Sequence, residues 1–280
     1  MAVTGSRWQR TIGIVGGLGP HAHITFEQEL LAQVESAGRD QDYPPWVLSS
    51  LPGTPDRTAA LLDGGTPPTP WLVESLKNLE GRADFAAVIC NTAHAFLDEA
   101  RAQVTIPVLH MIRETVLGIV ARVEPGSRVG LLATDGTLAS TIYPQTSRAM
   151  DADLHWRSLL ELPQGRELQG HLVMGSIFGE GHHGGLKAGL THDPQTGEAY
   201  ADRLRQAVER LVDDGCAVVV LGCTELSAPM KYGVQDLPLV DPIRLTAERC
   251  LQIAAGEAPL PEGPGDLALS RDHGPAPGET

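Results

Sequence analysis

The sequence predicts an α/β protein made of two similar halves, each built on an open, mostly parallel sheet with helices on both faces. Short β-branched apolar runs alternate with helical segments along the chain, and the same order of motifs occurs twice. The chain has 280 residues, which is enough for two domains of modest size. Its hydrophobic share of 42% and charged share of 20% are ordinary for a globular protein.

The first half begins with the run TIGIVGG at residues 11–17, which is typical of a buried parallel strand that ends in glycines. Phe26, Leu30 and Val34 follow at helical spacing and predict a helix with one apolar face. Further strands are predicted at residues 46–51, 86–90 and 105–111, with a helix at 93–103. This alternation predicts a parallel sheet with crossover helices.

The second half repeats the scheme. Strands are predicted at residues 128–134, 154–162, 216–223 and 237–242. A helix is predicted at 201–214, because apolar residues share one face there and Gly215 follows at the position that favours a left-handed backbone. A closing helix is predicted from Leu245 to Ala255.

Two pairs of motifs relate the halves. GIVGGLGP corresponds to GLLATDGT, and VICNTAH corresponds to VLGCTEL. We therefore expect two duplicated domains about a pseudo-twofold axis, with the active site in the cleft between them. The predicted N-terminal domain comprises residues 1–116 plus 228–255, and the C-terminal domain residues 117–227. Residues 256–280 hold five Pro and five Gly, so we expect a flexible tail.

The charge balance excludes some classes of partner. The chain carries 21 Lys and Arg against 35 Asp and Glu, a formal net charge of −14. The resulting field repels nucleic acid and anionic membranes, so neither is an expected partner. No apolar run approaches the roughly 20 residues of a bilayer span, and no signal peptide is apparent. Together with four sparse cysteines that form no C-x-x-C pair, this favours a cytoplasmic protein.

Cys90 and Cys223 are the candidate catalytic residues. Each follows a buried strand and precedes a polar helix start, which is where open α/β sheets bind ligands and where a helix N-terminus favours a thiolate. A single cysteine in this setting is more often an inert core residue. Two at corresponding positions of matching halves favour chemistry. Cys216 and Cys250 lack such a helix start and are predicted to be core residues.

Six motifs resemble those of the aspartate/glutamate racemase family, in the order typical of that family. They are CNTAH (90–94), GCTEL (222–226), GGLGP (16–20), PDRT (55–58), ATDGT (133–137) and GLKAG (185–189). They span about residues 11–245, and the aspartate racemase branch is the most similar. The resemblance implies two Rossmann-like domains and a homodimer that racemises a small acidic amino acid.

The resemblance also implies the chemistry. One thiolate removes the α-proton while the other thiol delivers a proton to the opposite face, without pyridoxal phosphate or any other cofactor. By the family pattern Cys90 faces the D-enantiomer and Cys223 the L-enantiomer. The implied substrate-binding residues are Gly17, Arg57, Asn91, Thr92, Thr134, Thr137, Lys187, Thr224 and Glu225. Among them Arg57 and Lys187 match positions that bind carboxylates.

Several alternatives stay open or are discounted. A hydantoin racemase or maleate isomerase would also use two cysteines, and a non-catalytic amino-acid-binding protein would need none. Whether the substrate is aspartate, glutamate or an analogue also stays open, although residues 167–200 are expected to carry specificity.

The motif GLGPHA resembles the glycine-rich turn of dinucleotide-binding proteins, but Pro20 removes a backbone amide that would bind phosphate. His182 and His183 lack a metal-ligand partner motif, so we expect no metal and a mobile glycine-rich lid. His94 is a candidate for polarising the Cys90 thiol.

Overall fold

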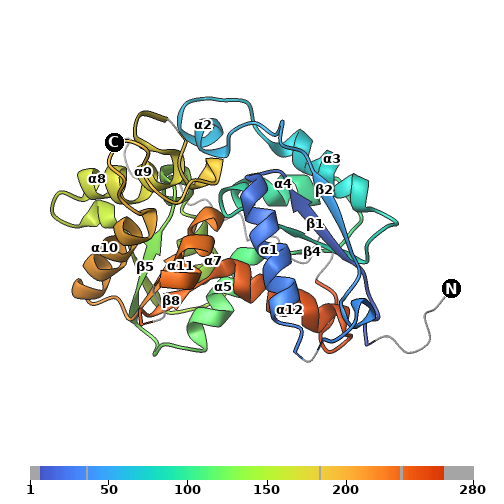
Figure 1. Ribbon diagram of the computed structural model, residues 1–280. Helices are drawn as coiled ribbons and strands as arrows, with labels where there is room; N and C mark the ends of the chain where they lie inside the picture. Colours follow the sequence, from blue (N-terminus) through green and yellow to red (C-terminus); the bar gives the residue numbers. More distant parts are fainter. Residues whose placement is uncertain (1–6, 36, 183, 234–235, 262–280) are drawn as a thin grey trace, which may run out of the picture.

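The computed structural model describes residues 7–35, 37–182, 184–233 and 236–261. Within them lie two four-stranded parallel sheets, flanked by helices and set side by side (Figure 1). This arrangement confirms the predicted fold class of two similar α/β domains. The predicted tail lies outside the described residues from position 262 onward. No helix within the described residues is long and apolar enough to cross a membrane.

The first sheet has the order β2-β1-β3-β4. Its strands are β2 (Trp46–Ser50), β1 (Ile12–Gly16), β3 (Phe85–Val88) and β4 (Val108–Leu109). Strand β1 is central and buried along its whole length, and Ile12 pairs with Trp46 on one side and with Phe85 on the other. A strand that is covered on both faces has no solvent-facing side, which explains its continuous apolar run.

The second sheet repeats this topology in the order β6-β5-β7-β8. Its strands are β6 (Leu154–Arg157), β5 (Ser127–Leu132), β7 (Val218–Leu221) and β8 (Leu239–Val240). In each half the first strand along the chain is flanked by the second and the third. Equivalent strands therefore end at equivalent positions, as the paired motifs predicted.

The predicted domain division needs one correction. Residues 228–255 were all expected in the N-terminal domain, but β8 pairs in parallel with β7 and extends the second sheet. The apolar pair in β8 gives β7 a partner on its second side. The return to the first half is made by α12 (Pro242–Ala254), which packs against α1 (Pro20–Ala32) and α5 (Met111–Val120). The rest of the division stays a prediction.

Longer helices cover the sheets, and short helices form the connections. Besides α1, α5 and α12, the helices of the first half are η1 (Asp40–Asp42), α2 (Arg57–Leu62), α3 (Thr69–Leu79), η2 (Thr92–Phe96) and α4 (Leu97–Arg101). In the second half they are α6 (Asp135–Ser140), α7 (Ile142–Ala149), η3 (Leu159–Glu161), α8 (Gly165–Leu168), the π-helix η4 (Gln169–Met174), α9 (Gly175–Phe178), η5 (Glu180–His182), η6 (Leu186–Ala188), α10 (Tyr200–Asp213), η7 (Thr224–Leu226) and α11 (Ser227–Gly233).

Several predicted strands are shorter in the structure than the sequence indicated, and two of them end at a turn that a side chain fixes. The strand predicted at 105–111 is reduced to β4, because the ring of His110 accepts a hydrogen bond from the amide of Arg113 and caps α5. The strand predicted at 154–162 ends at Arg157, where η3 begins after Ser158. Glu161 accepts hydrogen bonds from the amide and hydroxyl of Ser158 and so closes this turn.

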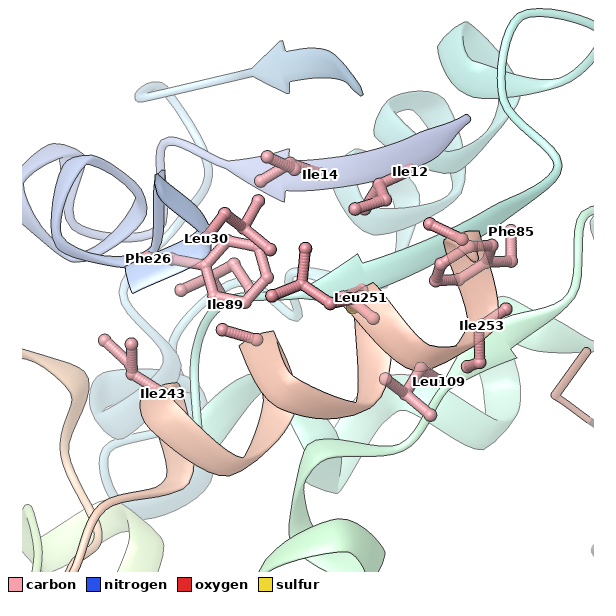
Figure 2. Packing of buried hydrophobic residues seen from close by; sticks show 14 of the residues in the cluster. Ile12, Ile14, Phe26, Leu30, Phe85, Ile89, Leu109, Ile243, Leu251 and Ile253 are labelled. Carbon is pink, nitrogen blue, oxygen red and sulfur yellow. The ribbon is translucent and has the colours of Figure 1, made fainter. Parts of the chain in front are cut away.

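The core of the first half lies between α1, β1, β3 and α12. Figure 2 shows the side chains of Ile14, Phe26, Leu30 and Leu251 converging there, and the first three are fully buried. A second cluster, which includes Val15 and residues of α3 and α4, covers the opposite face of the same sheet. The sheet is therefore a central layer between two helical layers, and its strand ends are fixed by packing on both sides.

Adjacent leucines on α1 provide a test of this packing. Leu30 is fully buried, whereas Leu31 is 40% exposed. Leu30→Ala should lower the free energy of unfolding by about 2–5 kcal/mol, because it leaves a cavity in the core. The matched control Leu31→Ala should cost under about 1 kcal/mol. Urea denaturation measures both, and equal losses would contradict the described packing.

Candidate active site

Cys90 and Cys223 lie just beyond the carboxyl ends of equivalent strands, β3 and β7. Both are buried, and both line one small cavity between the two halves of the chain. The first half contributes Asp56, Arg57, Thr58, Cys90, Asn91 and Thr92, and the second half contributes Thr134, Phe178, Lys187, Cys223, Thr224 and Glu225. The structure therefore brings together all the predicted site residues except Gly17 and Thr137, which do not line this cavity.

A close contact between helices holds the two sides of the cavity together. Helix α2, which begins with Arg57, packs against α6. A Cβ atom on Gly136 in α6 would lie only 2.7 Å from the Cα atom of Thr58, so a larger residue at this position would separate the helices. The side chain of Asp56 caps α2 by accepting a hydrogen bond from the Ala59 amide.

Arg57 supplies a buried positive charge beside Cys90. Its Nη2 donates to the Leu18 carbonyl at 2.7 Å and its Nη1 to the Pro55 carbonyl at 3.1 Å, while its Nε is buried without a partner. Burial opposes the charge, but the Cys90 sulfur and the Asp56 carboxylate raise the pKa of the guanidinium above its ordinary value. Arg57 is therefore held as a cation, with Nε available for an acceptor.

Cys223 has an anion as its neighbour instead. Its thiol donates to Glu225 Oε2 at 3.1 Å, and Lys187 Nζ donates to Glu225 Oε1 at 2.6 Å. Burial, and next the Glu225 charge, raise the pKa of Cys223 well above its ordinary value. Burial also opposes the charge on Glu225, but Lys187 lowers the pKa of that carboxyl. The Glu225 carboxylate thus keeps the Cys223 thiol protonated.

The two sulfurs consequently differ in electrostatic environment. Cys90 has the Arg57 cation beside it. The Glu225 carboxylate beside Cys223 favours a neutral thiol, which can act as an acid. One cavity thus holds two candidate catalytic cysteines from opposite halves of the chain, one beside a cation and the other beside an anion.

The GGLGP turn packs against Glu225 and adds no residue to the cavity lining. Gly19 has φ 129°, and a Cβ atom there would overlap the carboxylate of Glu225. Gly17, predicted to bind substrate, instead donates its amide to His23 Nδ1 at 3.3 Å. A Cβ atom on Gly17 would lie 2.5 Å from the Leu51 amide nitrogen, so the turn requires glycine for close packing.

Three threonine hydroxyls form a cluster across the two halves. Thr92 lies 2.7 Å from Thr137, and Thr134 lies 3.1 Å from Thr137, measured between Oγ1 atoms. Thr134 also caps α6 by accepting from the Thr137 amide. Thr92 and Thr134 line the cavity, whereas Thr137 contacts both hydroxyls without lining it. Thr137 therefore supports the hydroxyls that line the cavity.

His94 is used by the backbone, contrary to the suggestion that it polarises the Cys90 thiol. Its Nε2 accepts from the Met111 amide at 3.1 Å, so the Nδ1 hydrogen donates to the Cys90 carbonyl at 2.8 Å. Burial lowers the pKa of His94 to about 4. The imidazole is therefore neutral near pH 7 and fixes the main chain at Cys90.

The segment expected to carry specificity supplies one predicted residue and one that sequence reasoning missed. Lys187 was predicted, and Phe178 was not; the Lys187 ammonium lies 5.7 Å from the centroid of the Phe178 ring. The fully buried Arg203 fixes this segment from α10 by donating to Asp193 at 2.7 Å and to Glu198 at 2.6 Å. The only sequence signal for Phe178 was its position inside the predicted specificity segment. Asp56 and Thr58 were also missed as cavity residues, and their only signal was membership of the PDRT motif.

The described residues offer no alternative metal centre. They contain no group of three or more His, Cys, Asp or Glu side chains suited to hold a metal ion. His183, half of the histidine pair noted in the sequence, lies outside the described residues, and the predicted lid stays a prediction.

The state of Cys223 can be tested by alkylation. Because its pKa is raised well above the ordinary value, the thiol should react slowly with iodoacetamide at pH 7 and faster as the pH rises. Glu225→Gln removes the neighbouring anion, so the thiolate fraction and the alkylation rate at pH 8 should rise at least several-fold. Mass spectrometry of the Cys223 peptide measures the rate, with the Cys216 peptide as an internal control. An unchanged or slower Cys223 rate would contradict the assignment.

Comparisons with known proteins agree with this fold. The chain is 23% identical over 237 residues to the broad specificity amino-acid racemase RacX of Bacillus subtilis, covering 82% of this chain and 92% of that protein. The Picrophilus torridus aspartate racemase structure superposes with a TM-score of 0.71 at 25% identity, covering 89% of this chain and 95% of that one. An aspartate racemase homologue from Pyrococcus horikoshii shares the fold with a TM-score of 0.63 at 21% identity, covering 88% and 100%.

The family model described as Asp/Glu/Hydantoin racemase matches residues 15–250, which include both cysteine motifs and every strand of both sheets except the start of β1. The similar proteins named above include racemases, which agrees with the predicted enzyme class, an isomerase. The chain therefore belongs to the Asp/Glu/hydantoin racemase family.

Proposed function

We propose that this protein interconverts the D- and L-forms of an acidic amino acid, aspartate, glutamate or a close analogue, through Cys90 and Cys223 and without pyridoxal phosphate. The observation that carries the proposal is that two cysteines from equivalent strand ends line one cavity, one beside a cation and the other beside an anion. Binding alone would need no thiol, which favours an enzyme over an amino-acid-binding protein.

The proposed reaction is two-base proton transfer. The Cys90 thiolate removes the α-proton of the D-enantiomer, and the Cys223 thiol donates its proton to the opposite face of the α-carbon. The L-enantiomer leaves with Cys90 protonated and Cys223 ionised, which is the state that acts on the L-enantiomer in reverse. A single base would return the proton to the face it came from and leave the configuration unchanged.

The cavity walls can stabilise the developing carbanion. Asn91 and Thr92 line the cavity and offer an amide and a hydroxyl donor to a substrate carboxylate. Thr224 also lines the cavity, and its hydroxyl donates to Glu225 Oε2 at 3.1 Å. Arg57 and Lys187 add two cations, which suits a substrate with two carboxylates. Glu225 supplies an anion for the substrate ammonium group. The expected homodimer and cytoplasmic location stay predictions.

Single cysteine substitutions test the two-base reaction. Cys90→Ser should abolish racemisation but retain α-proton exchange with D₂O for the L-enantiomer, because Cys223 still reaches that face. Cys223→Ser should retain exchange for the D-enantiomer only. Proton NMR of D- and L-aspartate and glutamate measures the exchange.

Cys216→Ser is the matched control, since Cys216 is a buried cysteine outside the cavity and should not be needed for exchange. If the unaltered protein exchanges no α-proton of these amino acids, their close analogues or a hydantoin, the proposal fails.

The preference for an acidic side chain can be tested with a pair of nearly isosteric substrates. Aspartate and asparagine differ in the charge of the distal group, so their ratio of kcat/KM isolates the contribution of that charge. Lys187→Met should lower the aspartate-to-asparagine ratio by about tenfold or more, because a charged contact contributes roughly 1.5–3 kcal/mol. An unchanged ratio would show that Lys187 does not select the distal carboxylate.

A further inference from the structure

Tyr143 is a fully buried residue of α7, in the second half of the chain. Its hydroxyl donates to Asn91 Oδ1 at 2.5 Å, and Asn91 belongs to the CNT motif of the first half. The contact thus joins residues 52 positions apart from opposite halves. The Tyr143 ring also packs on Trp156 with centroids 5.2 Å apart, which restricts its movement.

The Asn91 carboxamide presents two different ends to its surroundings. Oδ1 is occupied by the Tyr143 hydroxyl, whereas Nδ2 is buried and has no hydrogen-bond partner. Asn91 lines the cavity and is 2% exposed. A buried amide donor without a partner costs about 1–3 kcal/mol, so the group is in place for an acceptor that the free protein lacks.

We propose that Tyr143 is a positioning residue that holds the Asn91 carboxamide with its Nδ2 donor toward the cavity, where it binds a carboxylate oxygen of the substrate. The inference rests on the proposed function, because it assigns the ligand group of the same site. It excludes the opposite orientation, in which Oδ1 would face the cavity and accept from the substrate ammonium.

The surrounding charges agree with this assignment. Glu225 is a carboxylate in the cavity lining and already offers an acceptor to an ammonium group. The Asn91 Nδ2 donor therefore complements Glu225, because it can bind a carboxylate group of the substrate while Glu225 binds the ammonium group. Burial raises the pKa of Tyr143 far above its ordinary value, although a hydrogen bond from Thr115 opposes this shift. The phenol consequently remains protonated and able to donate throughout the physiological pH range.

Tyr143→Phe tests the functional part of the proposal. Loss of one hydrogen bond frees the amide to rotate, so KM should rise about three- to tenfold with a smaller change in kcat. Tyr200→Phe is the matched control, because Tyr200 is equally buried but its hydroxyl has no hydrogen-bond partner among the described residues. That variant should leave KM unchanged.

A double-mutant cycle separates positioning from a general structural role. If Tyr143 acts through Asn91, then Tyr143→Phe should have no further effect on KM in an Asn91→Ala background. Equal effects of Tyr143→Phe in both backgrounds would overturn the proposal.

A crystal structure of the unaltered protein at atomic resolution tests the orientation without turnover. The two bonds from Cγ differ in length, about 1.23 Å to oxygen and about 1.33 Å to nitrogen, so the ends of the amide can be told apart. We expect the shorter bond to point to Tyr143. The longer bond on that side would overturn the proposal, whether or not the protein racemises an acidic amino acid.

Discussion

The ion pair between Lys187 and Glu225 determines how charge is distributed inside the cavity. Glu225 accepts from Lys187 through one oxygen and from the Cys223 thiol through the other, so one carboxylate connects the specificity segment to a candidate catalytic sulfur. A buried carboxylate without a cation would be costly and would take up a proton. Because Lys187 keeps Glu225 ionised, the Cys223 thiol has an acceptor and remains protonated. Cys90 instead has a cation, Arg57, as its neighbour.

Much of the remaining structure maintains these two environments. Gly19 leaves room for Glu225, Gly136 lets α2 approach α6, and Arg203 fixes the segment that carries Lys187. The net charge of −14 does not predict this local balance. Two cations and two carboxylates line the cavity, and at physiological ionic strength charges more than about 8–10 Å away are largely screened. The bulk charge therefore bears on large polyanionic partners, whereas these four side chains decide what a small ligand meets.

Strand positions and the paired cysteines could be predicted because they depend on local patterns. Apolar runs mark buried strands, and a cysteine after each of two such runs lies at equivalent sheet ends by topology. Gly17 was assigned to substrate binding because it lies in a motif, but its amide donates to His23, and a Cβ atom there would overlap the Leu51 backbone. The strand at β8 was predicted in the second half of the chain, but the domain division assigned it to the N-terminal domain, because two apolar residues do not indicate which sheet edge they will join.

The sequence by itself determined the α/β class, the duplication, and the presence of Cys90 and Cys223 at matching strand ends, since periodicity and turn residues act over short distances. Tertiary structure alone decided that Arg57 lies beside one sulfur and Glu225 beside the other, that His94 serves the backbone, and that Tyr143 contacts Asn91. Tyr143 and Asn91 come from segments far apart in the chain, and so do Lys187 and Glu225. Cys223 and Glu225 are only two residues apart, but Glu225 stays ionised because of the distant Lys187. These charges and hydrogen bonds exist only once the two halves have packed together and excluded water.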